Sequence, residues 1–445
     1  MASRPPCAWL RTLVRRSCAE RVRTGLRKPR NPALGARSPM IGHGMGNASS
    51  MIQQPCNRSW HARGRRWRWV SRALLAALVL PLGLAAAPDC RRVEIRAAGT
   101  GHPIVGAEDL AIDRSGRRVY IAAFDRWALE DALSADAARL PQGAIYSVAF
   151  EQLRERPAVL RATRVADGGA ADFHPHGIAL YQGPGQPRLY AINHAHEREA
   201  NEWQRKTRIE AFRARGDGRL QHLAGKHHER LCRANDLVAL GPTDLLITRD
   251  HGACGGPMLW MEQLLGLRRA QIVRAQTPPP WSDPENGLDI TVLADDIGLA
   301  NGITLEAGGE RVAVSATREE RVRIYRTREL LNATDPAPER SLPVPGGPDN
   351  LTWTHAGLFA ALHPSLLDMG MARHRWFGVR RAGTRVVRLE PSTGVLESLI
   401  DDPDAAQLNA GTTPALFDGV LVVGSVLDNA LLVCRTRQKG DAGAD

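Results

Sequence analysis

Short apolar runs separated by turns fill the chain from about residue 107 to residue 435, and six stretches share one arrangement. Each stretch begins with polar residues, continues as an apolar run, turns at small or polar residues and returns as a second apolar run. The six copies begin at residues 108, 176, 235, 301, 349 and 412, at intervals of 48 to 68 residues. Such intervals, with β-rich runs, are typical of four-stranded blades rather than helical repeats. The pattern therefore predicts an all-β, six-bladed β-propeller with four-stranded blades and short rim helices.

The polar residues that open the copies should converge, because equivalent positions of all blades face one central axis. These residues are Glu108, His176, Asn235, Asn301, Asp349 and Asn350. Most of them offer oxygen atoms, and buried carboxylates need a compensating positive charge. A hard cation with roughly six to eight oxygen ligands supplies it, which favours calcium over magnesium. The alternative is that each Asp or Asn only forms an Asx turn before its strand.

Two histidines belong to the second copy. His176 opens its first strand and His194 ends its second, so a hairpin brings both side chains to the same rim. A histidine at a strand end is more often exposed to solvent or packed in the core than catalytic. Its position among the converging polar residues nevertheless makes this pair a candidate catalytic site.

The net charge of +12 is concentrated before the repeats. Residues 1–88 contain 16 Lys and Arg residues and one acidic residue, whereas the remainder has 43 basic and 46 acidic residues. A near-neutral repeat region argues against nucleic-acid binding. We expect four segments: a disordered or over-extended leader at 1–60, a signal peptide or N-terminal anchor at 61–87, a propeller at 88–437 and a disordered tail at 438–445. The basic flank followed by the apolar run of residues 73–87 is typical of a secretory signal.

Four of the seven cysteines lie in the repeat region, and an exported chain favours disulfides. Four cysteines allow three pairings. Cys90 with Cys434 is the expected one, because a closed propeller must join its two ends. Cys232 and Cys254 form either a second disulfide or two buried thiols.

Three segments between the copies are also assigned from their sequence. Residues 127–140 are predicted as a loop or short helix, and 197–208 as a charged, solvated connection. Residues 257–267 have helical periodicity and are expected to pack on the blade tops, in preference to lining a pocket or lying on a membrane. No serine-hydrolase elbow, zinc-protease helix, Cys-x-x-Cys pair or phosphate loop is found in the sequence.

Several motifs occur in one order between Cys90 and Cys434 and resemble those of the paraoxonase (serum arylesterase/lactonase) family. They are Gly-Ala-Glu108-Asp109-Leu, Phe-His-Pro-His176-Gly-Ile178, Asn193-His194, Asn235-Asp236-Leu, Asp250-His251, Ala-Asn301-Gly-Ile, Pro-Asp349-Asn350-Leu and His363-Pro. The resemblance implies a six-bladed propeller whose ends are joined by a disulfide, with two calcium ions in its central tunnel. The loops at 197–208, 251–257 and near Trp281 depart from the family's animal members, so acyl and leaving-group preferences do not transfer.

The resemblance also implies residue roles. The catalytic calcium would be held by five residues, namely Glu108, Asn235, Asn301, Asp349 and Asn350. The structural calcium would use Asp109, Asp236 and the backbone carbonyl of Ile178. His176 would deprotonate water with His194 as its relay. Asp250 and His251 would lie near the tunnel and either support the ligands and bases from outside or relay a proton.

Together these features predict a calcium-dependent hydrolase of lactones and aryl esters, any phosphotriesterase activity being secondary. One alternative is a gluconolactonase-like sugar lactonase, which usually lacks the His pair. The other is a non-catalytic, calcium-stabilised propeller that binds a partner. The expected partner is a small lactone or ester, the expected location is periplasmic or secreted, and membrane association is expected only through the N-terminal apolar segment.

Overall fold

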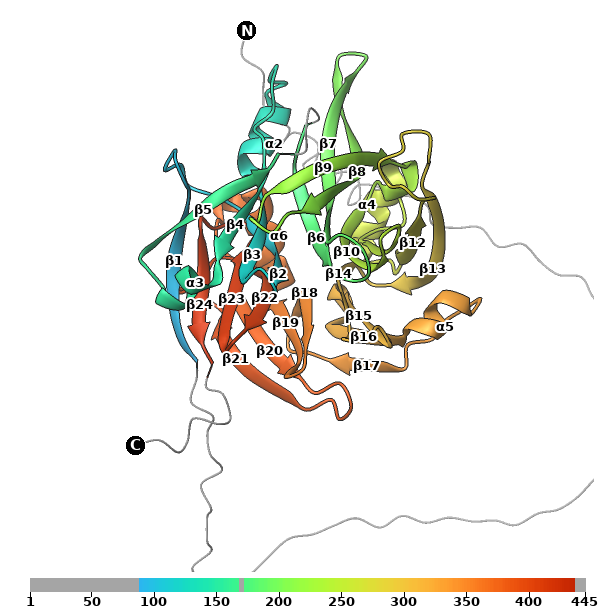
Figure 1. Cartoon of the computed structure of the whole chain (residues 1–445). Coiled ribbons are helices and arrows are strands. Elements are labelled where there is room, and N and C mark those ends of the chain that lie inside the picture. Colours follow the sequence, from blue (N-terminus) through green and yellow to red (C-terminus); the bar gives the residue numbers. More distant parts are fainter. Residues whose placement is uncertain (1–87, 168–171, 437–445) are drawn as a thin grey trace, which may run out of the picture. The chain divides into compact units, whose positions relative to one another are not determined.

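The computed structural model describes residues 88–167 and 172–436. In these residues six four-stranded antiparallel blades surround one axis (Figure 1). The innermost strands contact one another in the cyclic order β2, β6, β10, β14, β18, β22. The predicted six-bladed β-propeller is therefore confirmed. The predicted leader at 1–60, the signal or anchor at 61–87 and the tail at 438–445 lie outside the described residues.

Each blade runs from an innermost to an outermost strand. Blade one has β2 (Ala107–Asp113), β3 (Arg118–Ala123), β4 (Ala144–Ala149) and β5 (Val159–Ala166). Blade two has β6 (Pro175–Tyr181), β7 (Arg188–Glu199), β8 (Glu202–Ala214) and β9 (Leu220–His227). Blade three has β10 (Ala234–Gly241), β11 (Asp244–Arg249), β12 (Ala270–Gln276) and β13 (Asp289–Ile297). Blade four has β14 (Ala300–Leu305), β15 (Arg311–Ala316), β16 (Arg321–Arg326) and β17 (Arg340–Pro343). Blade five has β18 (Gly347–Thr354), β19 (Gly357–His363), β20 (Thr384–Leu389) and β21 (Leu396–Asp402).

Blade six is completed by the beginning of the described chain. It contains β22 (Gly411–Phe417), β23 (Val420–Ser425), β24 (Ala430–Arg435) and β1 (Asp89–Ala97). Strand β1 pairs antiparallel with β24, and Cys90 lies directly opposite Cys434 in that register. The two residues form a disulfide, which confirms the predicted closure. Strand β1 also pairs in parallel with β5, so it joins blades six and one; Figure 1 shows it in blue beside the red β24.

All six innermost strands carry a register shift at their polar opening residues. The shifts fall after Ala107, Pro175, Ala234, Ala300, Pro348 and Gly411. A β-bulge leaves one residue unpaired and re-aims its side chain. The same irregularity, repeated six times, places the polar residues of every copy at the centre while the following apolar residues pack between blades.

The blades pack through fully buried side chains. Between blades two and three, Tyr190 and Trp281 meet edge to face with their ring centroids 5.2 Å apart. Trp281 follows a proline-rich loop, and its indole nitrogen donates to the carbonyl of Ala224 at 3.3 Å. This residue is therefore part of the interior between the blades.

The rim carries five α-helices within the described residues. They are α2 (Arg126–Ser134), α3 (Phe150–Glu155), α4 (Gly256–Leu265), α5 (Thr327–Asn332) and α6 (Leu366–His374). Three short 3₁₀ turns, η1 (Glu229–Leu231), η2 (Thr317–Glu319) and η3 (Trp376–Gly378), complete them. The short helix expected within residues 127–140 is thus α2. None of the described helices combines the length and the apolar character that a membrane span requires.

The packing expected for α4 is wrong. Its apolar residues point outward, Trp260 being 72% and Leu264 84% exposed. Only Glu262 of this helix is buried, and its carboxylate accepts the backbone N–H groups of Gly252 and Ala253, each at 3.0 Å. The buried carboxylate of Glu262 therefore determines which face of α4 lies against the propeller, and the periodicity of apolar residues does not show this.

The connection expected at 197–208 is also wrong, because these residues continue the strands β7 and β8. The two strands pair from Arg188 with Arg213 to Glu199 with Glu202 and form a long hairpin (Figure 1). Ala200 and Asn201 turn the chain with positive φ values of 48° and 69°. Such a two-residue turn matches the twist of a hairpin, so a charged strand that projects beyond the core resembles a loop in sequence.

Candidate active site

Five of the predicted ligands lie together at the bulges around the axis. The carboxylates of Glu108 and Asp349 are buried, with 4% of each residue exposed. Asn235 and Asn350 are also buried, and Asn301 is half-buried. Oxygen atoms therefore line the centre. Among the described residues, Arg126 is the one Lys or Arg that forms an ion pair with these carboxylates, and their other partners are the imidazoles of His176 and His363.

The three asparagines share an unusual feature. Among the described residues, nothing donates a hydrogen bond to the buried Oδ1 atoms of Asn235, Asn301 and Asn350. The amide nitrogen of Asn350, in contrast, donates to Thr413 Oγ1 at 2.7 Å, which fixes the orientation of that amide. A buried acceptor without a donor costs on the order of 1–3 kcal/mol. Three such oxygens beside two carboxylates fit the ligand preferences of calcium.

Asp109 and Asp236 lie next to this group and tie the innermost strands together. Asp109 Oδ2 accepts the amide of Ile178 at 2.6 Å, across blades one and two. Asp236 Oδ2 accepts the amide of Ile303 at 2.8 Å, across blades three and four. Burial raises the pKa values of both carboxyl groups. Repulsion from Asp349 adds to the shift of Asp109, and repulsion from Asp109 adds to that of Asp236, although the backbone hydrogen bonds oppose both shifts. A cation near both would remove the repulsion, so this pair fits a second metal position.

Ile178 is placed by its amide, which donates to Asp109. The predicted role of its carbonyl oxygen as a calcium ligand stays a prediction.

Glu108 connects the metal ligands to the histidine pair. One of its oxygens pairs with the guanidinium of Arg126, the first residue of α2, which is itself 7% exposed. The other oxygen lies 3.1 Å from His176 Nε2. Burial raises the pKa of Glu108 to about 8, and the attraction of Arg126 offsets only part of that effect. The charged form of Glu108 therefore depends on the positive groups that surround it.

His176 is held in one orientation by the neighbouring blade. Its Nδ1 lies 2.8 Å from the carbonyl oxygen of Asn235, which can only accept, so Nδ1 carries the hydrogen. Nε2 is therefore the basic nitrogen of the neutral ring. Burial, followed by the charge of Arg126, lowers the pKa of His176 well below its usual range. The ring is neutral at pH 7, as a general base requires.

His194 faces His176 with the ring centroids 4.9 Å apart. Its Nδ1 lies 3.3 Å from Thr207 Oγ1 on the paired strand β8. Burial and then the charge of Arg205 lower its pKa well below the usual range. The two imidazoles predicted as a pair are thus adjacent and neutral, with His194 buried and the side chain of His176 12% exposed.

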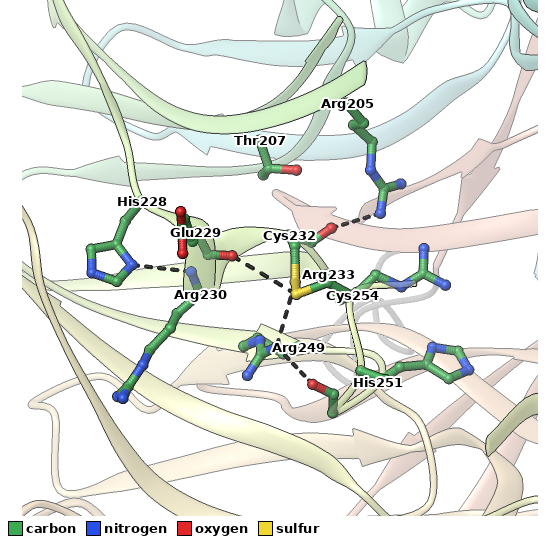
Figure 2. Close-up of a disulfide and its surroundings, with 12 residues drawn as sticks. Arg205, Thr207, His228, Glu229, Arg230, Cys232, Arg233, Arg249, His251 and Cys254 are labelled. Carbon is green, nitrogen blue, oxygen red and sulfur yellow. Dashed lines mark hydrogen bonds between the residues drawn. A yellow bond between two sulfur atoms is a disulfide. The ribbon is translucent and has the colours of Figure 1, made fainter. Parts of the chain in front are cut away.

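Asp250 and His251 follow β11 and are held by a second disulfide. His251 Nδ1 lies 2.8 Å from Asp250 Oδ1, and Arg233 Nε lies 3.4 Å from the same oxygen. Figure 2 shows the disulfide of Cys232 with Cys254 beside this segment. Of the two alternatives left by the sequence, these cysteines form the disulfide, which fixes the loop after β11 to the turn η1.

Three features of the site were not predicted from the sequence. Arg126 pairs with Glu108, but it belongs to the rim helix that follows blade one. Thr412 and Thr413 open the sixth copy and donate their hydroxyls to the carbonyl of Glu108 at 2.6 Å each. His363 Nε2 lies 2.8 Å from Asp349 Oδ2 and orients that carboxylate. The repeated position of the threonines and the His363-Pro motif were the sequence signals that marked this group.

Gly302 lies where two innermost strands approach closely. A Cβ at this position would be 2.6 Å from both the Cα of Asn350 and the carbonyl oxygen of Asp349. Because both neighbours are backbone atoms, we expect Gly302→Ala to lower the free energy of unfolding by about 1–3 kcal/mol. Gly287→Ala, whose Cβ would meet nothing within 4 Å, is the matched control in urea unfolding. Equal stability of the two variants would contradict the expectation.

Comparison with known proteins identifies relatives of the chain. The arylesterase family model matches residues 137–435. The chain is 24% identical over 306 residues to serum paraoxonase/arylesterase 2 of Gallus gallus, covering 65% of this chain and 76% of that protein. It is 24% identical over 265 residues to serum paraoxonase/lactonase 3 of Homo sapiens, covering 58% and 68%. Among solved structures, it is similar to a gluconolactonase from Xanthomonas campestris, with 16% identity, a TM-score of 0.42 and coverage of 81% and 99%.

Proposed function

The chain belongs to the arylesterase family, and from this premise we propose that it is a calcium-dependent hydrolase of lactones and aryl esters. The substrate is a small molecule that enters the centre of the propeller. Relatives named as arylesterases and lactonases support the ester-hydrolase class.

The observation that carries the proposal is the set of three unpartnered amide oxygens. Asn235, Asn301 and Asn350 each present a buried Oδ1 without a donor among the described residues, beside Glu108 and Asp349. Together they would hold the catalytic ion, and Asp109, Asp236 and the carbonyl of Ile178 would hold a second, structural ion. A set that only formed Asx turns would instead use these oxygens to accept local backbone N–H groups.

The chain's own residues supply the proton chemistry. When bound, calcium polarises the substrate carbonyl and stabilises the oxyanion. His176 Nε2 accepts a proton from water, and the resulting hydroxide oxygen bonds to the carbonyl carbon. The bond to the leaving oxygen then breaks, and the proton passes from His176 to that oxygen. His194 stabilises the charged imidazole and relays the proton, while Arg126 holds Glu108 in place.

Hydrolysis by the full-length chain of a δ-lactone and of phenyl acetate tests the proposal. We expect both activities to disappear when EGTA exceeds calcium and to return when calcium is restored. Activity that persists in EGTA would overturn calcium dependence. A folded, calcium-loaded protein that cleaves neither substrate would overturn the ester-hydrolase proposal, and turnover of gluconolactone alone would favour the sugar-lactonase alternative. Binding of calcium without any turnover would favour a non-catalytic propeller.

His176→Gln separates the contribution of the base from that of the metal. The variant keeps a polar side chain of similar length but cannot accept a proton at neutral pH. We expect kcat to fall by roughly 10²–10⁴-fold while calcium binding remains. His355→Gln, at an exposed position in the turn between β18 and β19, is the control. Unchanged kcat in His176→Gln would remove the histidine from the mechanism.

A further inference from the structure

A second cluster of potential metal ligands lies behind the histidine pair. Asp172 and His174 precede β6, and His196 lies on β7 two residues after His194. Asp172 Oδ2 is 3.0 Å from His174 Nδ1 and 3.5 Å from His196 Nδ1, and all three atoms lie within 4.8 Å of one another. His174 is fully buried and His196 is 9% exposed. We name these three residues the Asp172 triad.

The hydrogen bonds of the triad place two acceptor atoms around His174 Nδ1 with no positive charge between them in the described part of the chain. His174 Nε2 lies 2.8 Å from the carbonyl oxygen of Pro141, which can only accept, so Nε2 carries a hydrogen. His174 Nδ1 then faces two further acceptors, Asp172 Oδ2 and the carbonyl of His194 at 3.2 Å. A lone pair on Nδ1 would repel both, so this position requires either a second proton or a cation.

His196 provides the independent observation. Its Nδ1 is buried, points at the same oxygen of Asp172 and has no hydrogen-bond partner among the described residues. A structural hydrogen bond at this position would satisfy that nitrogen. A buried imidazole nitrogen that has no hydrogen bond and points at a carboxylate is instead typical of residues whose ligand atoms bind one metal ion.

The contacts around the triad resemble the outer contacts of metal sites. Metal-bound histidines usually donate their other ring N–H to a carbonyl or carboxylate, which fixes the tautomer. His174 does so to Pro141, and Asp172 Oδ1 accepts the side-chain amide of Gln142. The backbone N–H of His196 donates to Asp172 Oδ2 at 2.8 Å. His174 and Asp172 are thus oriented before any ion binds.

We propose that Asp172, His174 and His196 form a transition-metal site of the zinc class, separate in its residues from the calcium ring. Two imidazole nitrogens and one carboxylate oxygen suit zinc or cobalt, whereas calcium prefers oxygen ligands alone. Three protein ligands leave one position for water. The site adjoins the catalytic pair, because His194 also donates its backbone N–H to the carbonyl of His174 at 3.1 Å. The bound ion therefore stabilises the segment that positions His194.

Zinc titration of the full-length chain in excess calcium tests the site. After removal of metals with EDTA and dialysis into calcium, we expect calorimetry to show one equivalent of zinc bound. Cobalt should give visible absorption bands of a nitrogen- and oxygen-bound ion. His196→Asn should weaken zinc binding at least about 100-fold. His222→Asn is the matched control and should bind zinc as the wild type does. His222 pairs with Glu210 at 2.8 Å, but within residues 88–167 and 172–436 no third ligand joins this pair.

The readout is metal binding, so the result is independent of ester hydrolysis. Circular dichroism of His196→Asn shows whether the fold is kept, and Asp172→Asn replaces it if it is not. Absence of zinc binding at micromolar concentrations would overturn the proposal and show the triad to be a protonated imidazole paired with a carboxylate. Equal binding in His196→Asn and His222→Asn would overturn it as well.

Discussion

Asn301→Ala is expected to reduce lactone and aryl-ester hydrolysis by roughly 10²–10³-fold at micromolar calcium. The substitution removes one of the three buried amide oxygens that lack a donor. Loss of a neutral oxygen ligand weakens calcium binding, and a displaced ion no longer stabilises the oxyanion. Calorimetry should show the loss or weakening of one of two calcium-binding events, while the event at Asp109 and Asp236 remains.

Two further substitutions serve as controls for Asn301→Ala. Asn301→Asp retains an oxygen at the same position and should restore calcium binding more fully than alanine does. Asn332→Ala changes an exposed asparagine at the end of α5 and should leave both binding and turnover unchanged. Wild-type activity and calcium affinity in Asn301→Ala would show that its Oδ1 is not a ligand.

The ring of candidate ligands was predictable because each member opens a repeated unit. In a propeller, residues at the same position of each repeat lie next to one another around the axis. The sequence pattern alone therefore predicted that Glu108, Asn235 and Asn301 lie close together. The β-bulges at the starts of these strands could not be predicted from the sequence pattern. They show how a polar residue can leave the ladder at the start of a strand whose other residues are buried.

Other parts of the site depend on contacts between segments that no repeat relates. Arg126 reaches Glu108 from a rim helix of blade one, and sequence spacing says nothing about that approach. The Asp172 triad combines residues before β6 with the long strand β7, whose outer part has the charged composition of a loop. The exposed face of α4 was mispredicted because a single buried carboxylate, Glu262, anchors the helix.

Removal of the Cys90–Cys434 disulfide should lower the free energy of unfolding more than removal of the Cys232–Cys254 disulfide. The chain-entropy model assigns about 6 kcal/mol to a cross-link between residues 344 positions apart, against about 3 kcal/mol for one spanning 22 positions. We therefore expect the double substitution Cys90→Ser with Cys434→Ser to lower the free energy of unfolding by about 2–5 kcal/mol, since measured effects fall below the model.

Cys232→Ser with Cys254→Ser provides the matched comparison, because it also removes one disulfide but leaves the propeller closed. Urea unfolding of both variants under oxidising conditions should show the smaller loss for this inner pair. The backbone ladder between β1 and β24 remains in the closure variant, so its ends should separate before the blades unfold, and proteolysis should begin at β1. A loss for the closure variant no greater than that of the inner pair would mean that this ladder and the parallel pairing of β1 with β5 close the ring by themselves.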